Sequence, residues 1–485
     1  IGGIIGEVYS NNISVSGNIN LIECYNNGNI KGSTVGGIIG VKSGKFNVNK
    51  CYNTGHIVGN GYNGGIIGYV RDGRTELTEC YNIGDIDRDA TYRSDKSTMF
   101  GGIVGENISN EYCLIENCYN EGNITDTIGS EIGGIIGYST GTITISNSYN
   151  KGNIKAHNSG TFYIGGIMGY CSSKESSISN CYNSGNIDLS SIEGDWLNVF
   201  AGGIAAGVGN NDFEILKCYN LGDITYEGTF GGSVYIGGIE PIGYAIIDMC
   251  YNKGNHKCNI VTSDTMVKSY MGGIAVAGTR ITNSYNTGNI DNYMVSSGEC
   301  GSYTGGIAAY NNDIINSYNT GNIYSYNCSN STSSYSYVGG ISGENSSSNS
   351  ENNYNIGSVY NNVISPNLSD TPIYTGAIFG KGLIDDNSKN YYLQDIEVVG
   401  DYNLGASGYT QVNGKPLSED YMRSKEFYDV LSQKGDYWKY INNQYPILDI
   451  TAVSNAQKVT ELSVTNTKKT FDITTEIAEN EYESR

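Results

Sequence analysis

The sequence has no apolar run close to the roughly 18 residues that cross a bilayer, so we expect no membrane insertion in this segment. Basic residues are scarce, with 28 lysines and arginines against 49 acidic residues. A net charge of -21 disfavours nucleic acid as a partner, because phosphates would be repelled.

Histidine is scarcer still, and only His56, His157 and His256 are present. The metalloprotease motif HExxH is absent, and no CxxC pair offers a zinc site. In the repeat described below the three histidines fall roughly three coils apart, on the order of 14 Å at about 4.8 Å per coil. We therefore expect no metal site, no cofactor and no Ser-His pair.

The chain does contain one motif that is repeated about eleven times. Each repeat has a glycine pair, as in GGIIG, and then a block such as CYNNGNI; successive glycine pairs are 28 to 37 residues apart. Such a period indicates a solenoid, a propeller or an array. There is no signal peptide, but the chain opens within a repeat, so we expect it to be part of a longer protein. The glycine pairs begin at Gly2, Gly36, Gly64, Gly101, Gly133, Gly165, Gly202, Gly237, Gly272, Gly305 and Gly339, and a degenerate one begins at Gly376.

The residue types of the repeat favour a β-solenoid. Short β-branched runs such as TITISNSYN are bounded by Gly, Asn and Ser, and no apolar stripe has a helical period. Apolar residues recur four positions before each Tyr, such as Leu21, and five positions after it, such as Ile30, which predicts two inward stacks with His256 as an exception. We predict an all-β, right-handed parallel β-helix (β-solenoid) of about eleven coils, one coil per repeat.

Three repeat positions have an expected structural role. The glycine pair suits close backbone approach or a positive φ. The Asn after each Tyr tolerates the left-handed conformation and can form a hydrogen-bonded ladder. The position before the Tyr is Cys or Ser, so we expect a buried stack of reduced thiols: in-register neighbours about 4.8 Å apart are slightly too distant for an unstrained disulfide. Its cysteines are Cys24, Cys51, Cys80, Cys118, Cys181, Cys218 and Cys250.

The combination of GGIIG with CYNxGNI resembles the GLUG-type repeats of large surface proteins of Gram-positive, clostridia-like bacteria, which also occur beside some immunoglobulin A peptidase domains. The resemblance covers most of residues 1–380 and implies a surface-exposed scaffold. Residues 381–450 resemble the segment that closes such arrays; there Ser418 is a plausible N-cap for one helix and Gly435 its stop. We expect Trp438 and residues 445–448 to cover the open end of the solenoid. Residues 451–485 read as a linker and the truncated start of a further β-rich module.

The predicted function is that of a non-catalytic extracellular repeat region, a stalk or adhesin scaffold that binds host or cell-surface components. One alternative is a polysaccharide-active β-helix enzyme, because Asp85, Asp87 and Asp89 alternate and residues two apart on a strand share a face at about 6.6 Å. The other is an accessory region of a secreted peptidase.

The binding face is predicted from the segment whose length varies. From the Ile of GNI to the next glycine pair there are six or seven residues after Ile30 and Ile57, but about fifteen after Ile86 and Ile290. Insertions in solenoids collect on one face, often the binding face. Aromatic residues there suit a glycan or a protein partner; the competing and favoured interpretation is that they merely cover the edges of the stacked coils. The candidate binding residues are Tyr92, Trp196, Tyr226, Tyr293, Tyr303 and Tyr324.

Overall fold

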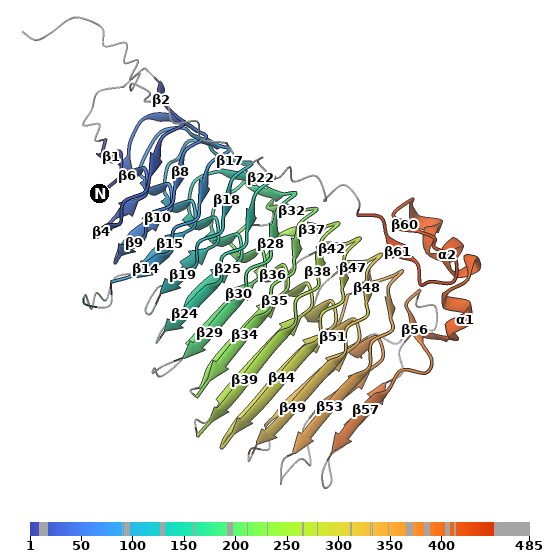
Figure 1. Ribbon diagram of the computed structural model, residues 1–485. Helices are drawn as coiled ribbons and strands as arrows, with labels where there is room; N and C mark the ends of the chain where they lie inside the picture. The colour runs from blue at the N-terminus through green and yellow to red at the C-terminus, as the bar shows by residue number, and fades with distance from the viewer. Residues whose placement is uncertain are drawn as a thin grey trace, which may run out of the picture.

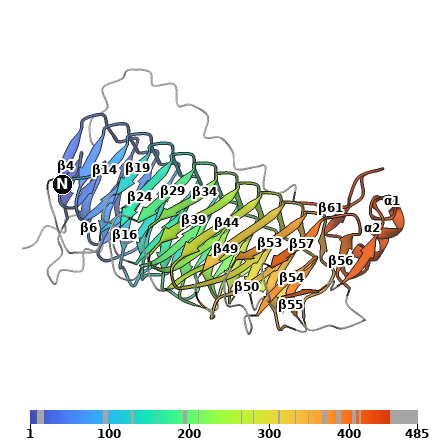
Figure 2. The same cartoon turned by 90° about the horizontal axis from the view of Figure 1, so that it is seen from below.

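The computed structural model is a stack of parallel coils that forms an elongated rod, with residue 1 at one end and two short helices at the other (Figures 1 and 2). It describes residues 1–450 except 9–17, 90, 92–97, 127–130, 159–160, 192–196, 211, 230, 264–265, 279, 311–312, 330, 332, 348, 365–371, 383–388, 403–407 and 412–413. The predicted all-β parallel solenoid, with a short helical segment near the C-terminus, is confirmed.

Each coil contains five short strands. In one coil these are β6 (Ile39–Lys42), β7 (Lys45–Asn49), β8 (Tyr52–Asn53), β9 (Ile57–Gly59) and β10 (Tyr62–Gly64). Each pairs in parallel with its equivalents in the coils on either side, so five sheets run along the rod, and we name each sheet by its strand in this coil. Within the described residues the β6, β7, β8, β9 and β10 sheets have 12, 10, 13, 12 and 12 strands, in keeping with about eleven repeats.

The β6, β7 and β8 sheets keep nearly constant strand lengths. The β6 sheet also contains β1 (Ile5–Glu7), β11 (Ile67–Val70), β16 (Val104–Asn107), β21 (Ile136–Ser139), β26 (Met168–Cys171), β31 (Ala205–Val208), β36 (Glu240–Gly243), β41 (Ala275–Ala277), β46 (Ala308–Tyr310), β51 (Ser342–Asn345) and β55 (Phe379–Gly382). The β7 sheet also contains β2 (Asn18–Ile22), β12 (Thr75–Thr78), β17 (Cys113–Glu116), β22 (Ile143–Ser146), β27 (Ser177–Ser179), β32 (Glu214–Leu216), β37 (Ile246–Asp248), β42 (Arg280–Thr282) and β47 (Asp313–Ile315). The β8 sheet also contains β3 (Tyr25–Asn26), β13 (Tyr81–Asn82), β18 (Tyr119–Asn120), β23 (Tyr149–Asn150), β28 (Tyr182–Asn183), β33 (Tyr219–Asn220), β38 (Tyr251–Asn252), β43 (Tyr285–Asn286), β48 (Tyr318–Asn319), β52 (Tyr354–Asn355), β56 (Tyr391–Leu393) and β59 (Lys415–Leu417).

The β9 and β10 sheets widen from strands of three residues or fewer near the N-terminus to strands of seven, and they narrow again to strands of five and four residues in the last coil (Figure 1). In the coils with seven-residue strands the variable segment is therefore largely strand, where the sequence suggested exposed loops. The β9 sheet also contains β4 (Ile30–Gly32), β14 (Ile86–Arg88), β19 (Ile124–Asp126), β24 (Ile154–Asn158), β29 (Ile187–Ser191), β34 (Ile224–Gly228), β39 (His256–Thr262), β44 (Ile290–Ser296), β49 (Ile323–Ser329), β53 (Val359–Ile364) and β57 (Val398–Tyr402). The β10 sheet also contains β5 (Val35–Gly36), β15 (Met99–Gly101), β20 (Glu131–Gly133), β25 (Phe162–Gly165), β30 (Leu197–Gly202), β35 (Gly232–Gly237), β40 (Met266–Gly272), β45 (Glu299–Gly305), β50 (Tyr335–Gly339), β54 (Ile373–Gly376) and β58 (Gly408–Gln411).

At the glycine pair the two sides of each coil approach closely, and we call this constriction the waist. A Cβ atom placed on Gly134 would lie 2.1 Å from the carbonyl oxygen of Gly166 in the next coil and 2.4 Å from Cγ of Asn150 across the coil. On either side of this waist lies a separate apolar core, one represented by Ile136 and Ile145 and the other by Ile132 and Ile154. Glycine is needed here for close approach, because any larger side chain would fill the waist.

Across the waist runs the predicted asparagine ladder. The side-chain amide of each Asn donates to the side-chain oxygen of the Asn in the next coil at 2.7–2.9 Å, from Asn26 to Asn355. The same nitrogen also donates to the Gly carbonyl two residues on, as from Asn150 to Gly152 at 2.8 Å. The left-handed residue of the coil, however, precedes the Cys position, as at Lys50 (φ 54) and Asn147 (φ 49). The ladder is confirmed, whereas its backbone conformation differs from the expectation.

The Cys position forms the expected stack, and all twelve cysteines of the chain are free thiols. Cys51, Cys80 and Cys118 are buried, while Cys24 in the first coil is only partly buried. The sulfurs of Cys51, Cys118, Cys181 and Cys250 each accept a backbone N–H from the preceding coil, as Cys118 does from Cys80 at 3.4 Å, and the hydroxyl of Ser148 accepts in the same way from Cys118 at 3.1 Å. The position therefore selects a small side chain that can accept a hydrogen bond.

The solenoid continues beyond residue 380, because β56, β57, β58 and β59 add to the β8, β9 and β10 sheets. Ser418 is the N-cap of α1 (Glu419–Met422) as expected, but Ser424 caps a second helix, α2 (Lys425–Leu431). The 3₁₀ turn η1 (Ser432–Lys434) then ends at Gly435, which has a φ of 138°. Two short helices thus replace the single one that was predicted.

The C-terminal segment packs against the side of the solenoid, where the sequence suggested that it covers the open end. Phe427 and Trp438 lie against the outward ring of Tyr354, whose hydroxyl donates to the carbonyl of Pro446 at 2.6 Å. Trp438 belongs to β60 (Trp438–Lys439), which pairs antiparallel with β61 (Ile447–Leu448). The reason is that the outer face of the β8 sheet offers a row of apolar tyrosine rings at this place.

Replacing Gly134 with Ala tests the waist. The added methyl group would overlap Gly166 and Asn150, so we expect unfolding in urea to show a loss of roughly 1 to 3 kcal/mol. Gly6→Ala is the control, because a Cβ there would meet no atom within 4 Å. Equal stability of the two variants would contradict this account.

Replacing Asn150 with Ala removes two ladder hydrogen bonds and the bond to Gly152. Buried polar groups are left without partners, so we expect a loss of roughly 2 to 4 kcal/mol in the free energy of unfolding. Asn153→Ala is the matched control, since Asn153 is exposed in the same coil. A smaller effect at position 150 than at position 153 would refute the role of the ladder.

Alkylation tests the thiol stack. Burial and the hydrogen bond with Cys118 raise the pKa of Cys80. At Cys51 the hydrogen bond with Cys24 lowers the pKa, but the bond with Cys80 and burial outweigh it and raise the pKa to about 12. A protonated, buried thiol reacts slowly. Iodoacetamide followed by mass spectrometry should therefore leave Cys51, Cys80 and Cys118 unlabelled in the native protein and label them after unfolding. Rapid native labelling, or disulfides among them, would be the opposite result.

Candidate binding surfaces

The structure places the predicted binding residues in different surroundings. Tyr92 and Trp196 lie outside the described residues. Tyr226 is only 1% exposed and points into the apolar core between the β9 and β10 sheets, the part of each coil that we call the wide lobe. It is in register with Leu189 and Cys258. This departs from the expectation of an exposed ring. The reason is that the segment continues strand β34, so Tyr226 shares the inward side of Ile224 two residues earlier.

Tyr303 lies in a continuous aromatic row on the outer face of the β10 sheet. Consecutive rings of this row are 4.6–5.5 Å apart and nearly parallel, so each interior ring has both faces covered by its neighbours. Only ring edges and hydroxyl groups remain for contact with solvent. The row consists of Tyr163, Phe200, Tyr235, Tyr270, Tyr303, Tyr337 and Tyr374.

The row also packs against the neighbouring β6 sheet. Tyr310 of that sheet lies 5.2 Å from Tyr303 and 5.6 Å from Tyr270, measured between ring centroids. Beneath these rings Val276, Ala277 and Ala309 are buried. The outer faces of the β6 and β10 sheets therefore meet at a concave edge, which these rings fill. For Tyr303 this favours the interpretation that the row covers the edges of the coils.

Tyr293 and Tyr324 have a different environment, on the outer face of the wide β9 sheet. Their side chains are 39% and 42% exposed. Each belongs to a stack of only two rings: Tyr293 with Tyr326 and Tyr324 with Tyr360, both at 4.8 Å. We call these four residues, on β44, β49 and β53, the tyrosine platform. Figure 1 shows these strands side by side in the broad part of the rod.

The platform was only partly visible in the sequence. Tyr360 and the neighbouring Asp291 were not predicted as site residues, although their positions relative to the inward Ile or Val of each coil reveal them. Tyr324 and Tyr360 each follow that residue by one position, and Tyr293 and Tyr326 follow it by three. Odd offsets from an inward residue on a strand point outward.

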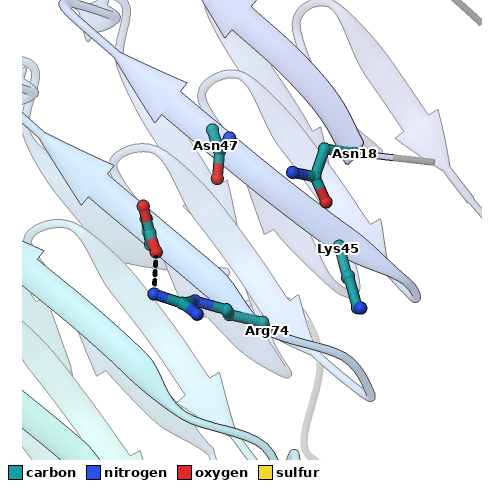
Figure 3. Close-up of a pocket in the computed structure, with 5 residues that line it drawn as sticks. Asn18, Lys45, Asn47 and Arg74 are labelled. Carbon is teal, nitrogen blue, oxygen red and sulfur yellow. Dashed lines mark ion pairs between the residues drawn. The ribbon is translucent and has the colours of Figure 1, made fainter. Parts of the chain in front are cut away.

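A shallow polar depression of about 280 Å³ lies on the outer face of the β7 sheet near the N-terminus (Figure 3). Asn18, Lys45, Asn47 and Arg74 line it together with Glu76, which forms an ion pair with Arg74. Because this ion pair neutralises Arg74, one of the two cations that line the depression, the surface carries charges of both signs and would attract a charged ligand only weakly.

The three aspartates of the enzyme alternative are engaged in structural contacts. Asp85 accepts a hydrogen bond from the backbone of Asn123 at 2.8 Å, and Asp87 contacts His56 at 2.8 Å. Hydrogen bonds from Thr91 and Lys31 lower the pKa of Asp89 to about 2, opposite to what a general acid needs. Only Asp87 lies within strand β14, so the expected alternation on one strand face is not formed.

The histidines lie apart. His256 occupies the inward stack in place of Ile, and burial lowers its pKa to about 4. His157 does contact Ser190 through Nδ1, contrary to the expectation of no Ser-His pair, because the two residues are in register on adjacent strands. Burial and the charge of Lys155 lower the pKa of His157. Across the described part of the chain, no three His, Cys, Asp or Glu side chains are placed to hold a metal ion.

Fold and surface together define a parallel β-solenoid repeat protein with aromatic outer faces. Residues 97–125 match a family model described as the GLUG motif. This match begins just before β15 and ends within β19, which is one coil, and the other coils repeat it in register. The match supports a GLUG-repeat protein, and the motif and fold fit a repeat region of a surface protein. No curated protein and no solved structure was found to match the chain.

Proposed function

We propose that this chain is the non-catalytic extracellular repeat region of a secreted or surface-attached bacterial protein, possessing a binding face for components of host or neighbouring cells. The observation that carries the proposal is the tyrosine platform: apolar ring surface held exposed on a rigid, regularly hydrogen-bonded sheet. Aromatic side chains provide large contact area at low entropic cost, because few torsions are frozen on binding.

One feature of the rod supports a scaffold role. The five sheets run along its length, so a load along the rod is shared by backbone ladders and by the asparagine ladder. No helix within the described ranges is long and apolar enough to cross a bilayer. The hydrogen-bonded aspartates described above give no support to the polysaccharide-active alternative.

The proposal predicts that the full 485-residue chain, fluorescently labelled, binds intact bacterial or epithelial cells and that Tyr293→Ala and Tyr324→Ala together reduce the bound signal about tenfold or more. Tyr244→Ala is the control, because Tyr244 is 56% exposed and lies outside the platform. Release of reducing ends from polysaccharides should stay at background. Absence of cell binding by the native chain would refute the proposal, and release of reducing ends would favour the enzyme alternative.

A further inference from the structure

The platform differs from the two long aromatic rows, on the β8 and β10 sheets, because each of its rings keeps a face that no other ring covers. In the β8 sheet the tyrosine rings follow one another at 4.7–5.2 Å from Tyr25 to Tyr354, so interior rings are covered on both faces. In the platform, Tyr293 has Tyr326 on one side and the shorter Asn259 on the other. A flat apolar surface is therefore open to a ligand only where a stack is interrupted.

Asp291 occupies the second interruption. It is in register with Tyr324 on the next strand and lies two residues before Tyr293, so all three side chains share the outer face. Asp291 is exposed, and it makes no hydrogen bond or ion pair with any described residue. An ionised carboxylate only accepts hydrogen bonds, and this one lies between Tyr324 and Lys257 on the adjacent strands.

The surrounding polar groups define the ligand chemistry further. Asn259 and Asn362 flank the Tyr293–Tyr326 pair in register, and each amide can both donate and accept. Lys257 lies next to Asp291 on the neighbouring strand, while Glu397 and Asp401 bring two carboxylates to the other side. Three carboxylates against one lysine make this face acidic, as is the whole chain with its net charge of -21, so it repels polyanions.

We infer that the tyrosine platform, with Asp291, is a binding site for an uncharged, hydroxyl-rich polysaccharide chain. The C–H face of a sugar ring packs on the free faces of Tyr293 and Tyr324, and its hydroxyl groups donate to the Asp291 carboxylate. The exposed sheet face suits an extended polymer that crosses several strands, since small ligands require concave pockets. This inference rests on the proposed function and specifies the partner of the same face.

Affinity electrophoresis of the full chain in native gels tests the inference. The gels contain a soluble β-glucan, a xyloglucan, a galactomannan or an α-glucan, with polygalacturonate as the anionic comparison. We expect retardation by at least one neutral polymer and none by polygalacturonate. Tyr293→Ala and Tyr324→Ala should each weaken binding about tenfold, the ratio that corresponds to roughly 1.4 kcal/mol.

Three further variants separate ring stacking from other effects. Tyr324→Phe keeps the ring face and should bind within about twofold of the native chain, whereas Asp291→Ala should weaken binding about tenfold by removing the acceptor. Tyr244→Ala should bind as the native chain does. Because the four changed side chains are exposed, thermal unfolding should show the native transition for every variant, and a variant with a lowered transition is replaced by Tyr293→Ser or Tyr324→Ser.

Several results would overturn the inference: no retardation by any neutral polymer, unchanged binding by the Tyr293→Ala and Tyr324→Ala variants, equal loss with Tyr244→Ala, or preference for polygalacturonate. Cell binding that persists without polysaccharide binding would mean that a protein or charged polymer is the partner. The proposed function would then stand while this inference fails. If the native chain binds neither cells nor polysaccharides, both the proposed function and this inference are wrong.

Discussion

The close contact between the glycine pair and the asparagine ladder is the constraint on which the solenoid depends. Gly134 leaves no room for a Cβ atom between Asn150 and the next coil, and the Asn amide uses that proximity to bond along the rod. A buried amide costs free energy unless it is satisfied, and here each nitrogen has two acceptors within 2.9 Å. Register is thereby fixed once per coil, because a slip by one residue would place a side chain in the waist.

The waist also explains why one lobe varies while the other stays constant. The narrow side holds the β6, β7 and β8 sheets, whose strands and thiol stack repeat closely. Beyond the waist, the β9 and β10 sheets are joined only at their outer turn, so residues can be added there without disturbing the register. The longer coils fill this space with polar contacts: Asn327 donates to Ser302 at 2.8 Å, and the hydroxyls of Ser302 and Ser336 are 2.8 Å apart. Where the strands of these sheets are still short, near the N-terminus, an ion pair lies there, between Arg88 and Asp126 at 3.3 Å.

Much of the fold could be predicted because each residue type of the motif occupies one fixed position in the coil. The Ile stacks, the Asn ladder and the Cys or Ser stack each depend on one residue type at one register position. The wide lobe was harder, since a fifteen-residue spacing fits an exposed loop as well as two longer strands. Tyr226 illustrates the difference: an even offset from Ile224 turns it inward only if the strand continues. The break between α1 and α2 was missed because Ser424 reads as an ordinary helical residue until its side chain caps Phe427.

The same amino acid serves two purposes in this protein, and stack length separates them. Stacked aromatic pairs contribute roughly 0.5–1.5 kcal/mol each beyond the area they bury, so an uninterrupted row along a sheet mainly stabilises the rod. Every interior ring of such a row has both faces covered by its neighbours, and the C-terminal segment covers the last rings of the β8 row through Trp438. A pair that ends beside Asp291 or Asn259 keeps the stabilisation of one contact and leaves one apolar face per ring. Recognition in a solenoid of this kind therefore depends on where a repeat position departs from its consensus, and the uniform positions supply the rigidity that holds those departures in place.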